Sequence, residues 1–326
     1  PEHMTPVTNW GLYPVQQADL RSFADAEELR PLVTAGGGPA IARGLGRCYG
    51  DSALAPRILS SHRADKFLAF DEQTGVLTCQ GGVSLAEILE ALAPRGWFLP
   101  VTPGTKFVSL GGAIAADVHG KNHHKEGNFG HHVLSMEVMR ADGQVVACGP
   151  DREIEFFETT CGGMGLTGVI LQATIRMRRI ESAYIRAEIL PAAHLDAVMK
   201  LFEQSADWTY SVAWIDCLAR GTQLGRSILM RGEHATVAEA APLLQGREPR
   251  DFRPVQKLSV PFSLPGFVLN PLTVRAFNTC YHAAQSRHAG SRITNYDTFF
   301  YPLDAIGDWN RIYGKRGFTQ YQAVFP

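Results

Sequence analysis

The chain has 326 residues, of which 45% are hydrophobic, and its 31 Lys and Arg residues against 32 Asp and Glu residues give a formal net charge of −1. At about 150 residues per domain this length predicts two domains, and the composition excludes a disordered chain. The balanced charge argues against a dedicated nucleic-acid binder, which would be clearly basic.

The cysteines and the start of the chain bear on the compartment. The six cysteines form no C-x-x-C pair, which argues against a zinc site or a disulfide framework and favours thiols in a reducing compartment. The sequence holds no run of about 18 apolar residues, so we expect no transmembrane span. Residues 1–4 read as a cloning remnant followed by the natural start at Met4, without a signal peptide. We expect a cytoplasmic protein or one peripheral at the cell envelope.

Strands, turns and helices alternate in the first half. Lys66–Cys79 predicts two strands joined by a turn. Ser84–Gly96 begins with capping-box spacing, continues with apolar residues at helical spacing, and predicts a helix that ends before Gly96. Val133–Cys148 predicts a hairpin, and Val169–Arg178 alternates as a half-buried strand does.

The composition of the chain changes after about Glu181: glycines become sparse, and aromatic residues appear in strand-like runs. His194–Gln204 predicts an amphipathic helix, whereas Ser211–Asp216 and Ser227–Met230 predict strands. Arg247–Pro271, rich in Pro and Arg, predicts a long loop. We therefore expect a domain boundary near residue 181.

The last segment, Phe318–Pro326, predicts a strand. A domain rarely finishes by exposing a fresh strand edge, so we expect the complete protein to continue past Pro326. Gln320 and Gln322 share one face of this predicted strand by its two-residue period. That face meets either solvent or a ligand.

Three glycine-rich clusters stand out: Ala42–Ser52, Pro103–Asn122 and Cys161–Gly168. Closely spaced glycines let the backbone approach a ligand and turn its N–H groups toward one point, which suits a pyrophosphate. A Rossmann loop would lead directly into a helix, but Pro56 interrupts that segment, and a phosphate-binding P-loop would need Gly-Lys-Ser/Thr. A tight loop that binds nothing remains the alternative.

The three clusters, in this order and spacing, resemble the FAD-binding domain of the vanillyl-alcohol-oxidase-like flavoproteins over about residues 5–181. The motifs Ala42–Asp51, Val118–His124 and Gly162–Gly168 are more specifically similar to the oxidase-subunit family of decaprenylphosphoryl-β-D-ribose 2′-epimerase. Phe300–Asp304 and Gln320–Gln322 extend this resemblance over nearly the whole chain.

The resemblance implies an α+β fold: a two-subdomain FAD-binding domain in residues 5–181 and a substrate domain built on an antiparallel sheet in residues 182–326. Family members continue past the position of Pro326, so this second domain is expected to be incomplete and the lysine usually assigned to catalysis to lie beyond it. The truncated chain is then expected to be inactive or nearly so.

The implied reaction is FAD-dependent oxidation of a secondary hydroxyl, the ribose 2′-hydroxyl, of a polyprenyl-phosphate-linked sugar to a ketone. A separate NADH-dependent short-chain reductase would complete an epimerisation that supplies arabinan for the cell wall, and the lipid-linked substrate implies peripheral membrane association. Two alternatives remain: an oxidase of a soluble polyol, sugar or aldonolactone, and a non-catalytic flavin-binding protein.

Arg47 occupies the position where many relatives attach FAD covalently through a histidine, so the resemblance implies non-covalent FAD. A guanidinium also suits a pyrophosphate oxygen, and the alternative is an ordinary surface arginine. The FAD contacts that the resemblance implies are Arg43, Gly44, Leu45, Gly46, Arg47, Cys48, Tyr49, Gly50, Asp51, Gly104, Thr105, Ser109, Leu110, Gly111, Gly112, His119, Gly120, Lys121, Asn122, Gly163 and Ile170.

His119 and Lys121 are the candidate catalytic residues. By resemblance, His119 lies beside the flavin and Lys121 binds the substrate phosphate, while a packed core histidine is the alternative for His119. The resemblance also places side chains in the substrate cleft that could otherwise be packing aromatics or solvent-exposed amides: Tyr49, Trp214, Tyr301, Gln320 and Gln322. No metal is expected, because the neighbouring histidines lack acidic co-ligands at suitable spacing: His123, His124, His131 and His132.

Overall fold

The computed structural model describes residues 4–254 and 258–322. The N-terminal part contains two sheets. The first has the strand order β1-β2-β4-β3, in which β1 is antiparallel to β2 and β4 is parallel to both β2 and β3. Its elements are β1 (Met4–Thr8), β2 (Val15–Ser22), α1 (Ala26–Thr34), β3 (Ala40–Arg43), β4 (Arg57–Ser60) and the 3₁₀ helix η1 (Ser61–Arg63).

The second sheet is antiparallel throughout, with the order β5-β6-β10-β8-β9. Its strands are β5 (Phe67–Asp71), β6 (Val76–Gln80), β8 (Val133–Met139), β9 (Val145–Cys148) and β10 (Val169–Arg176). The accompanying elements are α2 (Leu85–Leu92), β7 (Trp97–Phe98), α3 (Leu110–Ala115), α4 (His123–Glu126), η2 (Phe129–His132), α5 (Ile154–Thr160) and β11 (Arg178–Arg179), which pairs with β7.

A third, antiparallel sheet follows residue 181, with the order β13-β14-β12-β16. Its strands are β12 (Tyr184–Ala192), β13 (Tyr210–Ile215), β14 (Ser227–His234) and β16 (Gly290–Asn295). The other elements are α6 (Leu195–Glu203), η3 (Gly221–Gln223), α7 (Val237–Leu244), β15 (Leu258–Ser259), α8 (Pro271–Arg287), α9 (Tyr296–Phe300), η4 (Pro302–Ala305), β17 (Ile306–Gly307) and η5 (Trp309–Tyr313). The predicted α+β class with antiparallel sheets is confirmed.

Local sequence signals account for these elements. The side chain of Ser84 accepts a hydrogen bond from the Glu87 amide at 3.1 Å and the Glu87 carboxylate accepts one from the Ser84 amide at 2.8 Å, so the predicted capping box starts α2. The Val133–Cys148 hairpin forms as β8 and β9. The expected amphipathic helix is α6, which begins after the capping residue His194.

The predicted C-terminal strand is wrong over the described residues. Phe318 forms only an isolated bridge with Leu12, and residues 319–322 are in no strand. The segment bonds to loops instead: the Phe318 amide donates to the Gly11 carbonyl at 2.7 Å and the Gln320 amide to the Tyr49 carbonyl at 2.8 Å. Loops on this side leave no strand edge for it to extend; residues 323–326 lie outside the described residues.

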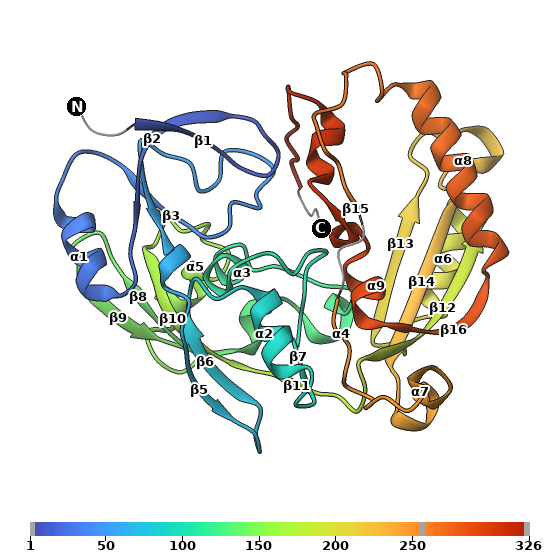
Figure 1. Cartoon of the computed structure of the whole chain (residues 1–326), viewed down its shortest axis with the longest axis horizontal. Helices are drawn as coiled ribbons and strands as arrows, with labels where there is room; N and C mark the ends of the chain where they lie inside the picture. Colours follow the sequence, from blue (N-terminus) through green and yellow to red (C-terminus); the bar gives the residue numbers. More distant parts are fainter. Residues whose placement is uncertain (1–3, 255–257, 323–326) are drawn as a thin grey trace.

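One hydrophobic core joins the second and third sheets. Figure 1 shows the first two sheets on one side of the molecule and the third on the other, with α9 between them. Phe98 of β7 is buried against the rings of Tyr296 and Phe300, at centroid distances of 5.4 Å and 5.2 Å. Tyr210 of β13 packs edge-to-face on Phe300, with ring centroids 4.9 Å apart. Aromatic packing therefore fixes how the two parts meet.

We expect Phe98→Ala to lower the free energy of unfolding by roughly 3–5 kcal/mol, because it leaves a cavity where the two parts share their core. Denaturant unfolding followed by tryptophan fluorescence measures the loss. Phe67→Ala is the matched control, since Phe67 lies on β5 with 42% of its side chain exposed. Losses of equal size in the two variants would show that the shared core does not hold the parts together.

Within the described ranges, no helix is both long enough and apolar enough to cross a membrane.

Candidate functional site

The first glycine cluster forms a loop that follows β3. Its carbonyl groups at alternate positions are held from one side by residues 9–11. The Trp10 amide donates to the Gly46 carbonyl at 2.8 Å and the Gly11 amide to the Cys48 carbonyl at 3.3 Å. The side-chain amide of Asn9 donates to the carbonyls of residues 50 and 52.

The amides of this loop are free by contrast. No described residue accepts a hydrogen bond from the backbone N–H groups of residues 45–52. The carbonyls of residues 46, 48, 50 and 52 are tied to residues 9–11, and the N–H groups of the loop remain available to an anionic ligand. Arg43 supports the base of the loop, because its guanidinium donates to the Thr8 carbonyl at 2.7 Å and to the Asn9 side chain.

Arg47 lies at the mouth of this loop. Its guanidinium stacks 3.8 Å from the ring centre of Trp10 and 5.1 Å from that of Phe107. Burial lowers the pKa of Arg47, and the nearby carboxylates Asp304 and Asp308 oppose that effect. Arg47 is therefore a fixed cation beside the free amides.

The second cluster packs directly against the first. A Cβ atom at position 44 would lie 2.1 Å from the Ser109 hydroxyl oxygen, and Ser109 also caps α3 by accepting from the Gly112 amide at 3.1 Å. Glycine at position 44 thus permits the close approach of the two clusters. Further along, His119 is exposed, whereas Asn122 is buried and donates to the Pro100 carbonyl at 2.8 Å.

Lys121 lies where the part of the chain before residue 181 meets the part that follows it. Its ammonium donates to the Phe299 carbonyl and lies 4.7 Å from the Phe299 ring centre and 5.7 Å from that of Phe300. Its own carbonyl accepts from the Ser211 amide of β13 at 2.8 Å. Burial lowers the pKa of Lys121 from 10.5 to about 8. One N–H is committed to Phe299, so the ammonium keeps donors for an anionic ligand.

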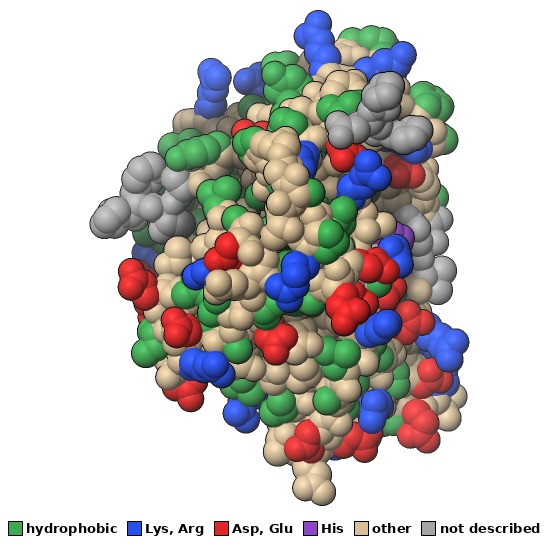
Figure 2. All heavy atoms as spheres, turned by 90° about the vertical axis from the view of Figure 1, so that its left-hand side faces the viewer, with side chains coloured by type: hydrophobic (Ala, Val, Ile, Leu, Met, Phe, Trp, Pro, Cys, Tyr) green, Lys and Arg blue, Asp and Glu red, His purple; other side chains and the backbone are tan. Residues whose placement is uncertain are grey.

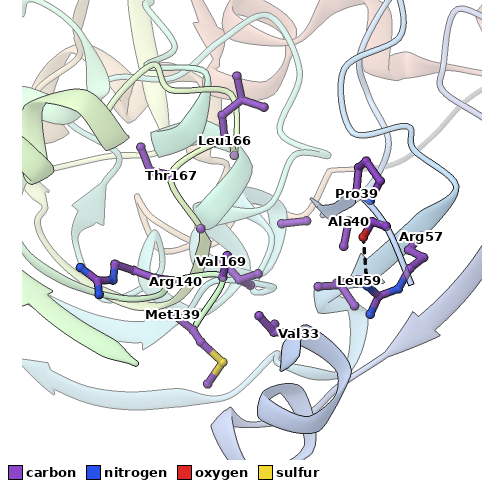
Figure 3. A pocket seen from close by; sticks show the side chains of 15 residues that line it. Val33, Pro39, Ala40, Arg57, Leu59, Met139, Arg140, Leu166, Thr167 and Val169 are labelled. Carbon is purple, nitrogen blue, oxygen red and sulfur yellow. Dashed lines mark hydrogen bonds between the residues drawn. The ribbon is translucent and has the colours of Figure 1, made fainter. Parts of the chain in front are cut away.

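The third cluster continues the second. The amides of Gly162 and Met164 donate to the carbonyls of Ile114 and Ala115 at the end of α3, at 3.1 Å and 2.8 Å. The following residues line a cavity of about 320 Å³ between the first and second sheets, with Val169 facing Leu59 across it (Figure 3). Gly163 and Ile170, which the sequence singled out, are adjacent to this cavity in the chain but do not line it.

The cavity includes residues that sequence reasoning missed, among them Arg57, Met139 and Arg140. Part of this cavity could have been found from the predicted Val133–Cys148 hairpin. Met139 pairs with Val169 in the β8–β10 register, so aligning the predicted strands would have brought residues 139–141 beside the third cluster. Arg57, on β4, could not be found in that way because the pairing of β3 with β4 crosses a long loop.

A set of polar contacts clamps α9 and η4 to the start of the second cluster. Both carboxylate oxygens of Asp304 accept hydrogen bonds, one from the Thr105 hydroxyl at 2.7 Å and one from the Lys106 amide at 2.9 Å. The Lys106 ammonium pairs with the Asp297 carboxylate, and both side chains are largely buried. Burial raises the pKa of Asp304 in spite of these donors. Lys106 and Asp297 were not among the predicted site residues.

The predicted substrate residues are divided among three places. Tyr49 packs beside Trp309 and Phe318, and its carbonyl accepts from Gln320, so the structure brings Tyr49 and Gln320 together. The side chains of residues 320 and 322 are exposed. Tyr301 is instead fully buried, with its hydroxyl 2.6 Å from that of Thr102. Trp214 lies further along β13, where it packs on Tyr281 of α8 at 4.9 Å.

The chemistry of this donor set fits FAD. Free amides and Arg47 match a pyrophosphate. Eight buried side-chain polar atoms have no partner among the described residues, and two of them lie beside the glycine clusters: the indole nitrogen of Trp10 and the hydroxyl of Thr167. One lies at the first loop and the other at the cavity beyond the third cluster, so unmet hydrogen-bonding groups occur at both ends of the three-cluster surface.

These loops and sheets define an FAD-dependent oxidoreductase. In agreement, a family model described as "FAD binding domain" matches residues 18–149. The chain is 37% identical over 328 residues to the decaprenylphosphoryl-β-D-ribose oxidase of Mycolicibacterium smegmatis, a match that covers 97% of this chain and 70% of that protein. The chain belongs to the family of that oxidase, and the resemblance found in the sequence is confirmed.

More distant relatives match over less than half of the chain. A D-lactate dehydrogenase of Archaeoglobus fulgidus is 29% identical over 147 residues, which is 43% of this chain and 33% of that protein. A putative D-arabinono-1,4-lactone oxidase of Neurospora crassa is 27% identical over 112 residues, 34% of this chain and 20% of that protein. The match to the mycobacterial oxidase, by contrast, extends along nearly the whole of the present chain.

We expect Gly44→Ala to weaken FAD binding by about tenfold, because the added methyl group displaces the Ser109 hydroxyl from its cap on α3 and presses on Ser109 Cβ. Titration of the apoprotein with FAD, followed by flavin fluorescence, measures the Kd. Gly266→Ala is the control, since a Cβ atom there would meet no atom within 4 Å. Unchanged FAD affinity in the Gly44 variant would show that the contact between the two clusters does not contribute to FAD binding.

Proposed function

We propose that this protein uses FAD to oxidise the ribose 2′-hydroxyl of a polyprenyl-phosphate-linked sugar to a ketone. The observation that carries the proposal is the half-buried ammonium of Lys121 where the two parts of the chain meet, next to loops that fit FAD, in a chain aligned over 97% of its length with a decaprenylphosphoryl-ribose oxidase. Bound FAD would accept the hydride of the secondary alcohol, and the hydroxyl proton would pass to a base other than His119 and Lys121.

The residues of the first two clusters would hold the cofactor without a covalent bond. The free amides of residues 45–52 and the guanidinium of Arg47 would bind the pyrophosphate. Residues 5–181 would then form the FAD-binding domain and residues 182–326 the substrate domain, with the contact between Lys121 and Phe299 at their border.

His119 and Lys121 would divide the remaining tasks. His119, exposed in the second cluster, would lie against the flavin. Lys121 would bind the substrate phosphate with the N–H donors that Phe299 leaves free. Tyr49, Gln320 and Gln322 would contact the sugar from the first-loop side, while Trp214 and the buried Tyr301 would shape the opposite wall.

The ketone product would need a second reaction. A separate NADH-dependent short-chain reductase would return it to an alcohol from the opposite face, which completes the epimerisation that supplies arabinan. Because the substrate is carried by a lipid, the enzyme would work at the cell envelope as a peripheral protein.

The direct test is anaerobic reduction of the bound flavin. A polyprenyl-phosphoryl ribose should bleach the flavin absorbance, whereas soluble polyols, sugars and aldonolactones at the same concentration should not. Bleaching by a soluble substrate alone would replace the proposal with a soluble-sugar oxidase. If the lipid-linked ribose bleaches the flavin of the full-length gene product but not that of the 326-residue chain, the proposal holds for the full-length protein. If no alcohol bleaches the flavin of either, the protein is a flavin binder without this activity.

We expect acid or heat precipitation to release the yellow chromophore into the supernatant, because Arg47 cannot form the covalent bond that a histidine forms at this position. Absorbance of the supernatant near the flavin maximum measures the release. Colour that stays with the denatured pellet would show a covalent link at another residue.

We expect Lys121→Ala to weaken a phosphate-bearing substrate by about tenfold to a hundredfold, the effect of one charge-assisted hydrogen bond of roughly 1.5–3 kcal/mol. FAD affinity should change far less. Equal losses for FAD and substrate would give Lys121 a purely structural role.

The same residue predicts a pH dependence. Since burial lowers the pKa of Lys121 to about 8, its ammonium is present below that pH and is lost above it. The wild-type value of kcat/KM, which reports the free enzyme, should therefore fall above about pH 8 relative to that of Lys121→Ala. Parallel profiles for the two proteins would contradict a charged Lys121 in substrate binding.

A further inference from the structure

An exposed apolar segment, residues 258–277, runs from β15 into the first turns of α8. Five of its large apolar side chains are between 61% and 78% exposed: Leu258, Phe262, Phe267, Leu272 and Phe277. Single exposed apolar residues are ordinary on a protein surface, but five within so short a segment mark an interaction surface.

The charge of this region is one-sided. From Leu258 to Tyr296 the sequence contains Arg275, Arg287 and Arg292 but neither Asp nor Glu, although the whole chain has a net charge of −1. The face of the molecule shown in Figure 2, which carries α1, has acidic and basic side chains interspersed. One carboxylate faces the segment from outside this stretch: Asp308 accepts from the Ser259 hydroxyl at 3.0 Å and is paired with Arg311 at 3.5 Å. Exposed aromatic and aliphatic side chains, with arginines and without acids of their own, match an anionic lipid surface rather than water.

The segment is attached to the candidate site. The amides of Val260 and Leu264 donate to the carbonyls of Gly307 and Arg311, each at 2.9 Å, and the Arg311 guanidinium donates to the Val260 carbonyl at 2.9 Å. Between these partners lies Trp309, whose ring is 6.1 Å from that of Tyr49 in the first glycine loop. A surface bound through residues 258–277 would therefore hold the first-loop side of the site close to it.

We propose that residues 258–277 bind the surface of an anionic lipid bilayer, with the phenylalanine side chains inserted at the interface and Arg275 against the lipid phosphates. This inference rests on the proposed function, because a polyprenyl chain keeps its sugar at the membrane. The enzyme then meets the sugar phosphate at the bilayer surface and the lipid chain does not have to leave it.

The test is co-sedimentation of the FAD-loaded chain with vesicles of phosphatidylcholine, alone or mixed with phosphatidylglycerol, in the absence of any substrate. The double variant Phe262→Ser/Phe267→Ser should reduce partition to the mixed vesicles by about tenfold or more. Arg275→Gln should reduce the preference for mixed over pure vesicles. The control Met199→Ser/Phe202→Ser, which removes exposed apolar side chains from α6, should leave partition unchanged.

Other occupants of the segment would overturn the proposal. Equal partition of the Phe262/Phe267 variant and the control would place membrane binding elsewhere. If sedimentation without vesicles shows a dimer that only the Phe262/Phe267 variant dissociates, the segment binds a second copy of the chain instead.

Failure of this inference is distinguishable from failure of the proposed function. If the protein oxidises a short-chain phosphoribose in solution but does not bind vesicles, the proposed function stands and the proposed membrane surface is wrong. If the protein binds mixed vesicles through Phe262 and Phe267 but oxidises no lipid-linked ribose, the membrane surface stands and the proposed function is wrong.

Discussion

The first glycine loop has its carbonyls bound on one side and its amides free on the other, and the candidate site depends on that arrangement. The carbonyls at alternate positions accept hydrogen bonds from Asn9, Trp10 and Gly11. No described residue accepts a hydrogen bond from the N–H groups of residues 45–52. Buried or half-buried amides without acceptors are costly unless a ligand accepts from them. The loop is therefore prepared for an anion before any cofactor arrives.

The second part of the chain is fixed against this loop by buried polar contacts as well as by aromatic packing. Asp304 accepts from Thr105 and the Lys106 amide, and the Lys106 ammonium pairs with Asp297. An ion pair removed from water is stable only when its geometry is maintained, so these contacts specify one position of α9 and η4 over the glycine clusters. That position also sets the place of Lys121 beneath Phe299.

The sequence predicted the elements whose signals are local. The α2 capping box, the β8–β9 hairpin and the alternation of β10 each follow from residues close in the chain. The C-terminal strand failed because its alternating pattern does not reveal that its neighbours, Gly11 and Tyr49, lie in loops. The clamp of Asp304 on Lys106 and the cavity at Arg57 were beyond prediction, since each joins segments that are distant in sequence. The glycine clusters indicated the cofactor, whereas the free amides required the structure.

Amide hydrogen exchange in the presence and absence of FAD tests the central claim most directly, namely that the first loop binds the cofactor through its backbone. The account predicts that FAD slows exchange in residues 45–52, whose N–H groups have no acceptor among the described residues, and leaves α6 unchanged. Exchange of the loop at the same rate with FAD fully bound would contradict it.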